Sequence, residues 1–78
     1  MPRFFLHLRD GGQLLEDPEG SELPGLDAAR ADALAAAREI AAERLKAGAP
    51  PIAGEFEIRD AAGRLLATVP FPQVSAPP

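Results

Sequence analysis

The sequence predicts an α+β fold in which two β-hairpins flank one long helix, in the order ββαββ. Apolar and polar residues alternate near both ends of the chain, and a glycine-containing turn interrupts each alternating segment. Between these segments lies an alanine-rich stretch without glycine or proline, which is typical of a helix. The economical arrangement is a four-stranded, mostly antiparallel sheet with the long helix packed on one face.

The first hairpin is predicted over residues 4–16, with the turn at Asp10-Gly11-Gly12. A loop of Asp10-Gly11 would pair Leu15 with Leu6, and a loop of Gly11-Gly12 would pair it with Leu8. Both registers place the same residues on each face, because side chains alternate along a strand. The two faces are Phe4, Leu6, Leu8 and Leu15 on one side, and Phe5, His7, Arg9 and Leu14 on the other.

The helix is predicted from Asp27 to Ala47. Asp27 is the expected N-cap, with Leu26 before it as an apolar staple residue, and Gly48 is expected to end the helix. One apolar stripe is expected to face the sheet, and its alanines would let the helix lie close to the strands. The stripe consists of Leu26, Ala33, Leu34, Ala37, Ile40, Ala41 and Leu45.

The second hairpin is predicted over residues 55–69, with a turn at residues 60–63. A three-residue loop would place Ile58 opposite Leu66, unless a bulge near Thr68 shifts the phase. The sequence therefore does not decide which face of the last strand points to the core. The first and last strands are the most apolar, so we expect them at the centre of the sheet.

The chain length and composition limit the classes of function. Its 78 residues make one domain, predicted over residues 1–71, and the Pro-rich segment 72–78 is expected to be a disordered tail. The absence of cysteine excludes disulfides and thiolate metal sites. The net charge of -4 disfavours nucleic-acid and anionic-membrane binding. Neither a signal peptide nor a membrane span is recognisable, so we expect a cytoplasmic protein without a membrane partner.

Several blocks of the sequence resemble a known family. They are PRFFLHLRDG (2–11), DPEGSELP (17–24), ARADA (29–33), DAAGR (60–64) and VPF (69–71). Together they resemble a family of short bacterial proteins of unknown function that is common in alphaproteobacteria. The resemblance covers about residues 2–71 and implies a stand-alone bacterial domain. It implies no catalytic residue and no cofactor.

The residues that carry chemistry are few. His7 is the single histidine and has no cysteine or second histidine to complete a metal or nucleophile site, so we expect a half-exposed strand residue. The acidic loop of residues 17–22 alternates oxygen ligands but fails the calcium-loop pattern at its sixth and twelfth positions. We therefore predict no catalytic, metal or cofactor site, and not an enzyme.

Arg30 is the unusual residue of the helix, because it projects into the apolar stripe. A charged side chain there must reach solvent or find a partner. We expect a structural ion pair between Arg30 and a carboxylate of the acidic loop, and ligand contact is the alternative role.

One helix covers only one face of a sheet, and the other face is predicted to be too apolar for exposure in a chain this small. The candidate interaction face consists of Phe5, His7, Arg9, Leu14, Arg59 and Leu65. We expect a binding or regulatory module that uses this face for a homodimer or a protein partner. The alternative is nucleic-acid or small-ligand binding, with Phe5 as a stacking surface. That reading depends on a basic strand face of Arg3, His7, Arg9, Arg59 and Arg64.

Overall fold

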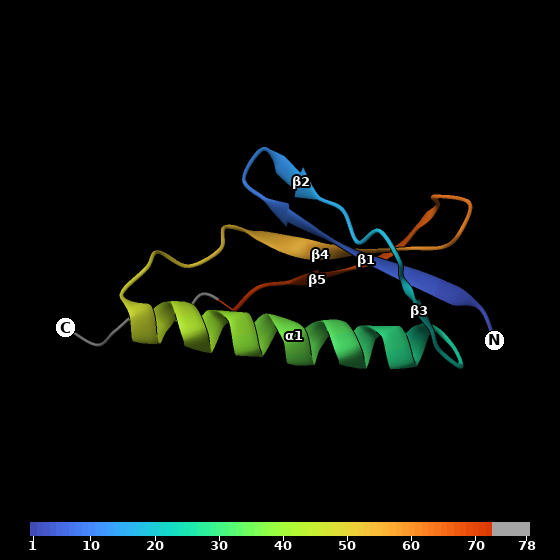
Figure 1. Cartoon of the computed structure of the whole chain (residues 1–78), viewed down its shortest axis with the longest axis horizontal. Helices are drawn as coiled ribbons and strands as arrows, with labels where there is room; N and C mark the ends of the chain where they lie inside the picture. The colour runs from blue at the N-terminus through green and yellow to red at the C-terminus, as the bar shows by residue number, and fades with distance from the viewer. Residues whose placement is uncertain (73–78) are drawn as a thin grey trace.

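The computed structural model describes residues 1–72 and shows an antiparallel sheet with one long helix on one side (Figure 1). The predicted α+β class and the ββαββ order are confirmed. The sheet has a fifth, two-residue strand in the segment predicted to be an acidic loop. The elements are β1 (Arg3–Asp10), β2 (Gln13–Leu15), β3 (Ser21–Glu22), α1 (Leu26–Ala47), β4 (Gly54–Arg59) and β5 (Leu65–Pro70).

The strand order is β2-β1-β4-β5, and β3 also pairs with β1. β1 is central as expected, but the expectation that the last strand is central was wrong, because β5 lies at an edge. The apolar side chains of β4 explain this order. Phe56 and Ile58 are buried, and a strand with neighbours on both sides buries such side chains best.

The register of the first hairpin agrees with one of the two predicted loops. Leu8 pairs with Leu15, so Gly11-Gly12 forms the loop, and Gly11 has a positive φ of 62°. β3 extends the same edge of β1, pairing Arg3 with Glu22 and Phe4 with Ser21.

The second hairpin contains a bulge that corrects the predicted register. Ile58 pairs with Ala67 instead of Leu66, and the next pair is Arg59 with Leu65. Leu66 is therefore the additional residue on β5, and the phase shifts there rather than near Thr68. Because of this shift, Val69 joins the core.

The helix begins one residue before its predicted start. Gly25 occupies the N-cap position in an extended conformation, and no side chain caps the helix, so the assignment of Asp27 as N-cap was wrong. Asp27 instead lies in the first turn, where a carboxylate favours the positive end of the helix dipole. Gly48 ends the helix as predicted, with a left-handed φ of 69°.

The core lies between α1 and the sheet. Ala29, Ala33 and Ala37 are fully buried, so the helix packs close to the strands as expected. Leu34 and Leu45 are 38% and 50% exposed, so the stripe that faces the sheet is narrower than predicted. The remaining buried apolar residues are Phe4, Ile52, Phe56, Ile58, Val69 and Phe71.

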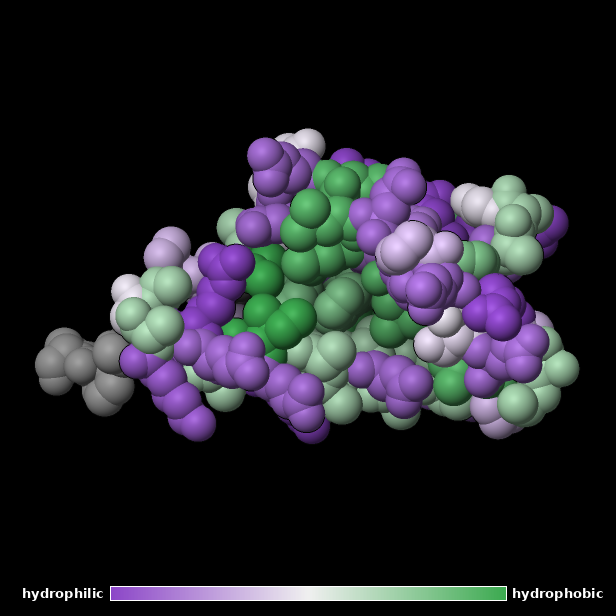
Figure 2. Space-filling view, viewed as in Figure 1, coloured by the Kyte–Doolittle hydropathy of each residue, from purple (hydrophilic) through white to green (hydrophobic). Residues whose placement is uncertain are grey.

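An apolar hollow opens on the helix side of the sheet, between α1 and the β1–β2 hairpin (Figure 2). Leu6 and Leu8 face this side and are only partly buried, while Leu15, which pairs with Leu8, is 55% exposed. The predicted apolar opening was expected on the opposite face.

No helix among residues 1–72 has the length and hydropathy needed to cross a membrane. The tail predicted to be disordered lies outside the described residues, except for Pro72.

Candidate functional site

The six residues predicted to form an interaction face all lie on the side of the sheet opposite α1. Cross-strand pairing brings Phe5 next to Arg59, Arg59 next to Leu65, and Arg9 next to Leu14. His7 lies between Phe5 and Arg9 on β1. We call this surface the open face.

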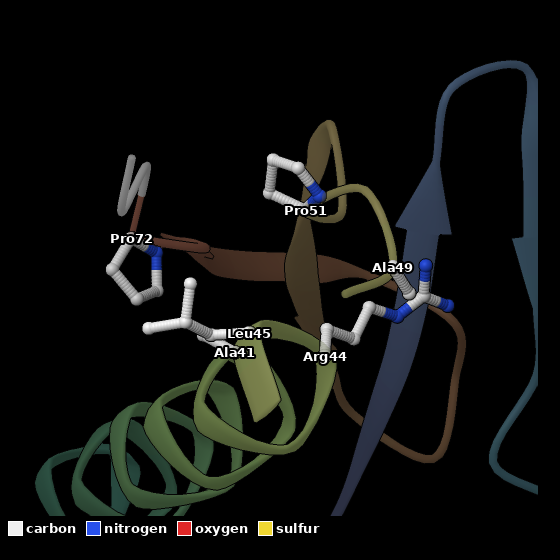
Figure 3. Close-up of a pocket in the computed structure, with 6 residues that line it drawn as sticks. All are labelled: Ala41, Arg44, Leu45, Ala49, Pro51 and Pro72. Atoms are coloured by element: carbon white, nitrogen blue, oxygen red, sulfur yellow. The ribbon is translucent and has the colours of Figure 1, made fainter. Parts of the chain in front are cut away.

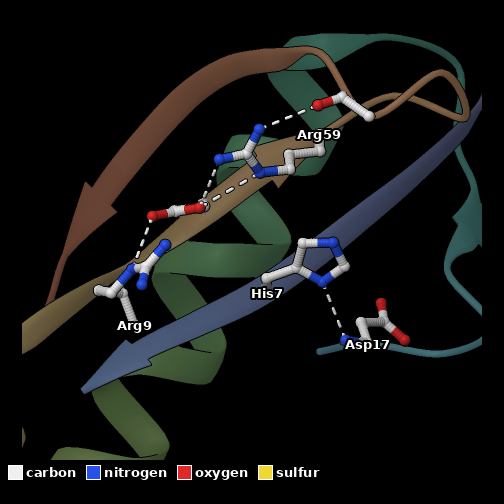
Figure 4. A network of polar contacts seen from close by, with 6 residues as sticks. His7, Arg9, Asp17 and Arg59 are labelled. Atoms are coloured by element: carbon white, nitrogen blue, oxygen red, sulfur yellow. Dashed lines mark hydrogen bonds and ion pairs between the residues drawn. The ribbon is translucent and has the colours of Figure 1, made fainter. Parts of the chain in front are cut away.

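The centre of the open face is charged, which the prediction of a mainly apolar face missed. Glu57 lies opposite His7 on β4 and is only 8% exposed, although no helix covers it. Arg9 Nε donates to Glu57 Oε2 at 3.0 Å, and Arg59 donates to Oε1 from Nη2 at 2.8 Å and from Nε at 3.2 Å (Figure 4). Glu57 is thus buried beneath the two guanidinium groups that it binds.

This arrangement lowers the pKa of Glu57 below its ordinary value of 4.5. The hydrogen bonds from Arg59 are the largest cause, followed by the hydrogen bond from Arg9. Burial acts in the opposite direction, since it penalises the charged form. The carboxylate is therefore held in its ionised state by its two arginine partners.

The sequence contained a signal for Glu57. In the segment 55–59 the acidic and basic residues alternate with Phe56 and Ile58, so they must share the face opposite the core. The signal was incomplete because the position of β4 in the sheet was not predicted. A central β4 places Glu57 beside the side chains of β1.

The two arginines differ in the donors that they leave available. Arg59 Nη1 donates to Gly63 O at 2.9 Å, so each of its three nitrogens has a partner. Arg9 donates to the described residues from Nε alone, and its Nη1 and Nη2 make no hydrogen bond with any of them. The side chain of Arg9 is 38% exposed. Arg9 is therefore the cation of the open face that can bind another group.

His7 is half-buried, as expected, and is held by the loop that follows β2. Its Nδ1 accepts a hydrogen bond from Asp17 N at 2.9 Å, so the neutral ring carries its proton on Nε2 (Figure 4). The ring of Phe5 lies 6.2 Å from the His7 ring, centroid to centroid, with 35° between the planes. The histidine thus has a structural role in anchoring the loop.

Asp17 organises the acidic loop around the edge of β1. Its Oδ2 accepts from Leu6 N at 3.3 Å, and its Oδ1 accepts from Gly20 N at 3.1 Å and Glu19 N at 3.3 Å. Because Leu6 lies between the stretches of β1 that pair with β2 and β3, Asp17 closes the gap in this edge.

The ion pair predicted for Arg30 is wrong. Arg30 is exposed and makes no ion pair among residues 1–72, because its position on the helix flank lets the side chain reach water. Arg3 holds the acidic loop instead. Its Nη1 donates to Glu19 O at 2.7 Å, and its Nη2 contacts Glu22 Oε1 at 3.3 Å.

A shallow depression of about 270 Å³ lies on the open face between the loop of Asp17 and the β4–β5 turn. Two of the three carboxylates at its wall, those of Asp17 and Asp60, already have structural partners. Asp17 accepts three backbone N–H groups, and Asp60 Oδ1 accepts from Ala62 N and Arg64 N. In the described part of the chain, no three His, Cys, Asp or Glu residues are grouped to hold a metal ion. The remaining lining residues are Phe5, His7, Glu16, Pro18, Ala61 and Gly63.

Comparison with known proteins adds the family of the chain. No curated protein and no solved structure matches it. A family model described as a domain of unknown function matches residues 3–72, which is nearly the whole chain, and the protein therefore belongs to the DUF6894 family.

Proposed function

We propose that this protein is a small non-enzymatic binding module of the bacterial cytoplasm that contacts a protein partner through the open face. The observation that supports the proposal most directly is the state of Arg9. Glu57 fixes its guanidinium through Nε, while Nη1 and Nη2 have no partner among the described residues. A cation held in this way is oriented before a ligand arrives, which lowers the entropy cost of binding.

The chemistry around Arg9 defines the partner. Two terminal nitrogens of a guanidinium match the two oxygens of a carboxylate, so we propose that the partner supplies an Asp or Glu side chain. Leu14 lies beside Arg9 across the strand pair, and Phe5 and the half-exposed Leu65 lie farther along the face. These apolar groups fit a protein segment that also carries an apolar side chain. The attraction to the partner comes from Arg9 and the groups around it, because the net charge of -4 gives no long-range attraction to an acidic partner.

Site-specific photo-crosslinking in the source cells tests the proposal. A benzophenone amino acid is placed at Phe5 or Leu65 on the open face, and at the exposed Ala35 on α1 as the control. We expect one discrete crosslinked product from the open-face positions and none from Ala35. Arg9→Ala should abolish this product, whereas Arg38→Ala on the exposed side of α1 should leave it unchanged. Equal crosslinking from Ala35, or a product that persists in Arg9→Ala, would contradict the proposal.

Nucleic-acid binding has less support from the geometry. Arg3 contacts Glu22, and Arg9 and Arg59 share the carboxylate of Glu57, so two carboxylates offset half of the charge of the four arginines on the predicted basic strand face. We expect no mobility shift of DNA or RNA at low salt. Binding that weakens steeply with ionic strength would favour the nucleic-acid reading instead.

A further inference from the structure

The sheet extends beyond the part that α1 covers. α1 lies against β1, β4 and β5 and makes no close contact with β2. The apolar hollow between α1 and the β1–β2 hairpin opens over this uncovered part (Figure 2). Its strand side is formed by Leu6, Leu8 and Leu15, and Leu15 is 55% exposed. An exposed apolar surface that is gathered in one hollow is typical of a binding site.

The helix side of the hollow is apolar at its base and acidic at its border. Ala36 and Ile40 of α1 are half-buried and pack against the core. Asp32, Glu39 and Glu43 are exposed and are spaced by seven and four residues, so they lie on one flank of the helix. Hydrophilic residues accordingly follow the helix along the hollow (Figure 2).

The charges of α1 between its first and last turns are separated onto two flanks. Ala41 and Leu45 line a gap of about 20 Å³ with Pro72, which follows β5, so their flank faces β5 (Figure 3). Two arginines share this flank. Arg30 lies about 20° from Ala41 around the helix axis, and Arg38 lies about 20° from Leu45. The three acids lie on the other flank, towards β1, and it is this flank that borders the hollow.

The positive charges near the hollow lie at one end of it. Arg44 and Lys46 belong to the last turn of α1, and Arg44 Nη1 already donates to Pro50 O at 3.2 Å. Asp10 is the last helix-side residue of β1 and adds an acid at the hairpin end. Asp10 and the three acids of the helix outnumber the two bases, so the border of the hollow is negative at neutral pH.

We propose that the hollow binds an amphipathic helix of a partner protein, in which Lys and Arg border an apolar stripe. The apolar stripe would cover Leu8, Leu15 and Ile40, and the basic residues would meet the acidic border. A helix fits because the acids extend from Asp32 to Glu43, which is about 16 Å along α1. A second helix alongside α1 repeats its own charges with the same period.

This site differs from the open face in place and in the charge that it selects. The two surfaces lie on opposite sides of the sheet and do not overlap. The open face offers Arg9 to a carboxylate, whereas the hollow offers carboxylates to a basic segment. The module would therefore be able to hold two different partners at the same time.

Isothermal titration calorimetry of the full chain with a synthetic peptide tests the proposal. The probe is an alanine-based helix of about 18 residues, or five turns, with a leucine stripe bordered by lysine. The control peptide carries glutamate in place of lysine. We expect saturable one-to-one binding of the lysine peptide and no binding of the glutamate peptide. Equal binding of the two peptides, or no saturable binding up to about 1 mM, would overturn the proposal.

Two matched pairs of variants locate the binding surface. Leu15→Ser should weaken binding of the lysine peptide at least about fivefold, whereas Leu45→Ser, at a leucine that is 50% exposed on the β5 flank, should leave it unchanged. Glu39→Gln and Ala31→Lys each raise the net charge by one unit, but Ala31 lies on the outer side of the helix. Glu39→Gln should therefore weaken binding about threefold and Ala31→Lys should not. Equal weakening within either pair would contradict binding in the hollow.

Backbone amide NMR separates this site from other occupants. The lysine peptide should shift the amide resonances of Leu6, Leu8 and Ile40, and shifts confined to the open face would refute the proposal. Resonances of these residues that move with protein concentration in the absence of peptide would place a second copy in the hollow instead. Arg9→Ala should leave peptide binding intact, so a failure of the open-face crosslinking and a failure of this proposal are independent results.

Discussion

The two faces of the sheet use the same strands in opposite ways. On the helix side, Phe56 and Ile58 of β4 are buried against fully buried alanines of α1. On the open face, the neighbouring Glu57 is nearly as buried, but beneath two guanidinium groups. Apolar burial contributes to stability in proportion to area, whereas a partly exposed ion pair contributes little and fixes orientation. The helix side therefore holds the fold together, and the open face positions groups for binding.

The largest difference between the faces is expected at two adjacent residues, Ile58 and Glu57. Ile58→Ala should lower the free energy of unfolding by about 2–5 kcal/mol, because it leaves a cavity in the core. A chain of this length has a total stability of roughly 4–12 kcal/mol, so the variant should be close to unfolding. Urea denaturation followed by circular dichroism measures the change. A loss below that of Glu57→Gln would break the distinction between the faces.

Close approach of the helix gives a second test of the helix side. Ala37→Leu should destabilise the protein by about 1–3 kcal/mol, since the added atoms must separate α1 from the sheet. Ala35→Leu is the matched control on the exposed side of the helix, and it should change stability by less than about 0.5 kcal/mol. Thermal melting of both variants makes the comparison. Equal effects would mean that helix propensity, rather than packing, sets the outcome.

Alternation of residue types was sufficient to predict the fold class, the helix and the two faces of the first hairpin, but it left two registers of that hairpin open until the pairing of Leu8 with Leu15 decided between them. It also predicted the six open-face residues, because a strand has only two faces and the core residues define one of them. The strand order was not predictable in this way. Local pattern carries little information on which strands meet, and β5 looked more apolar than β4 although it lies at the edge.

The partners of the charged residues were also not predictable, because they too depend on which elements meet in the fold. The helical stripe placed Arg30 near the sheet, but the alanines bring α1 so close that the contact surface is narrow and Arg30 stays in solvent. The actual partner of the acidic loop is Arg3, which pairing of β1 with β3 places beside Glu22. The role of Glu57 likewise depends on β1 and β4 being neighbours. These contacts are long-range in sequence, so spacing could not predict them.

The open face should be less sensitive to substitution. Glu57→Gln should cost about 1–2 kcal/mol, because it weakens hydrogen bonds to two charged groups that remain partly exposed. Glu22→Gln removes an exposed ion pair with Arg3 and should cost less than about 0.5 kcal/mol. Urea denaturation of both variants resolves the difference. A Glu57→Gln variant as stable as Glu22→Gln would show that the arginines orient themselves without Glu57.

Lowering the pH should weaken the ion pairs of the open face, and this is the smallest of the expected effects on stability. The folded-state pKa of Glu57 lies below 4.5, so the folded state binds fewer protons at this site than the unfolded state. Its contribution to stability is therefore fully present above about pH 5 and is lost as the pH falls through 4.5 towards the lowered value. Wild type should lose its advantage over Glu57→Gln across this window, because glutamine does not titrate. The measurement is the free energy of unfolding of both proteins in urea at several pH values. A constant difference between the two would mean that Glu57 has an ordinary pKa, and that its role on the open face is packing rather than charge.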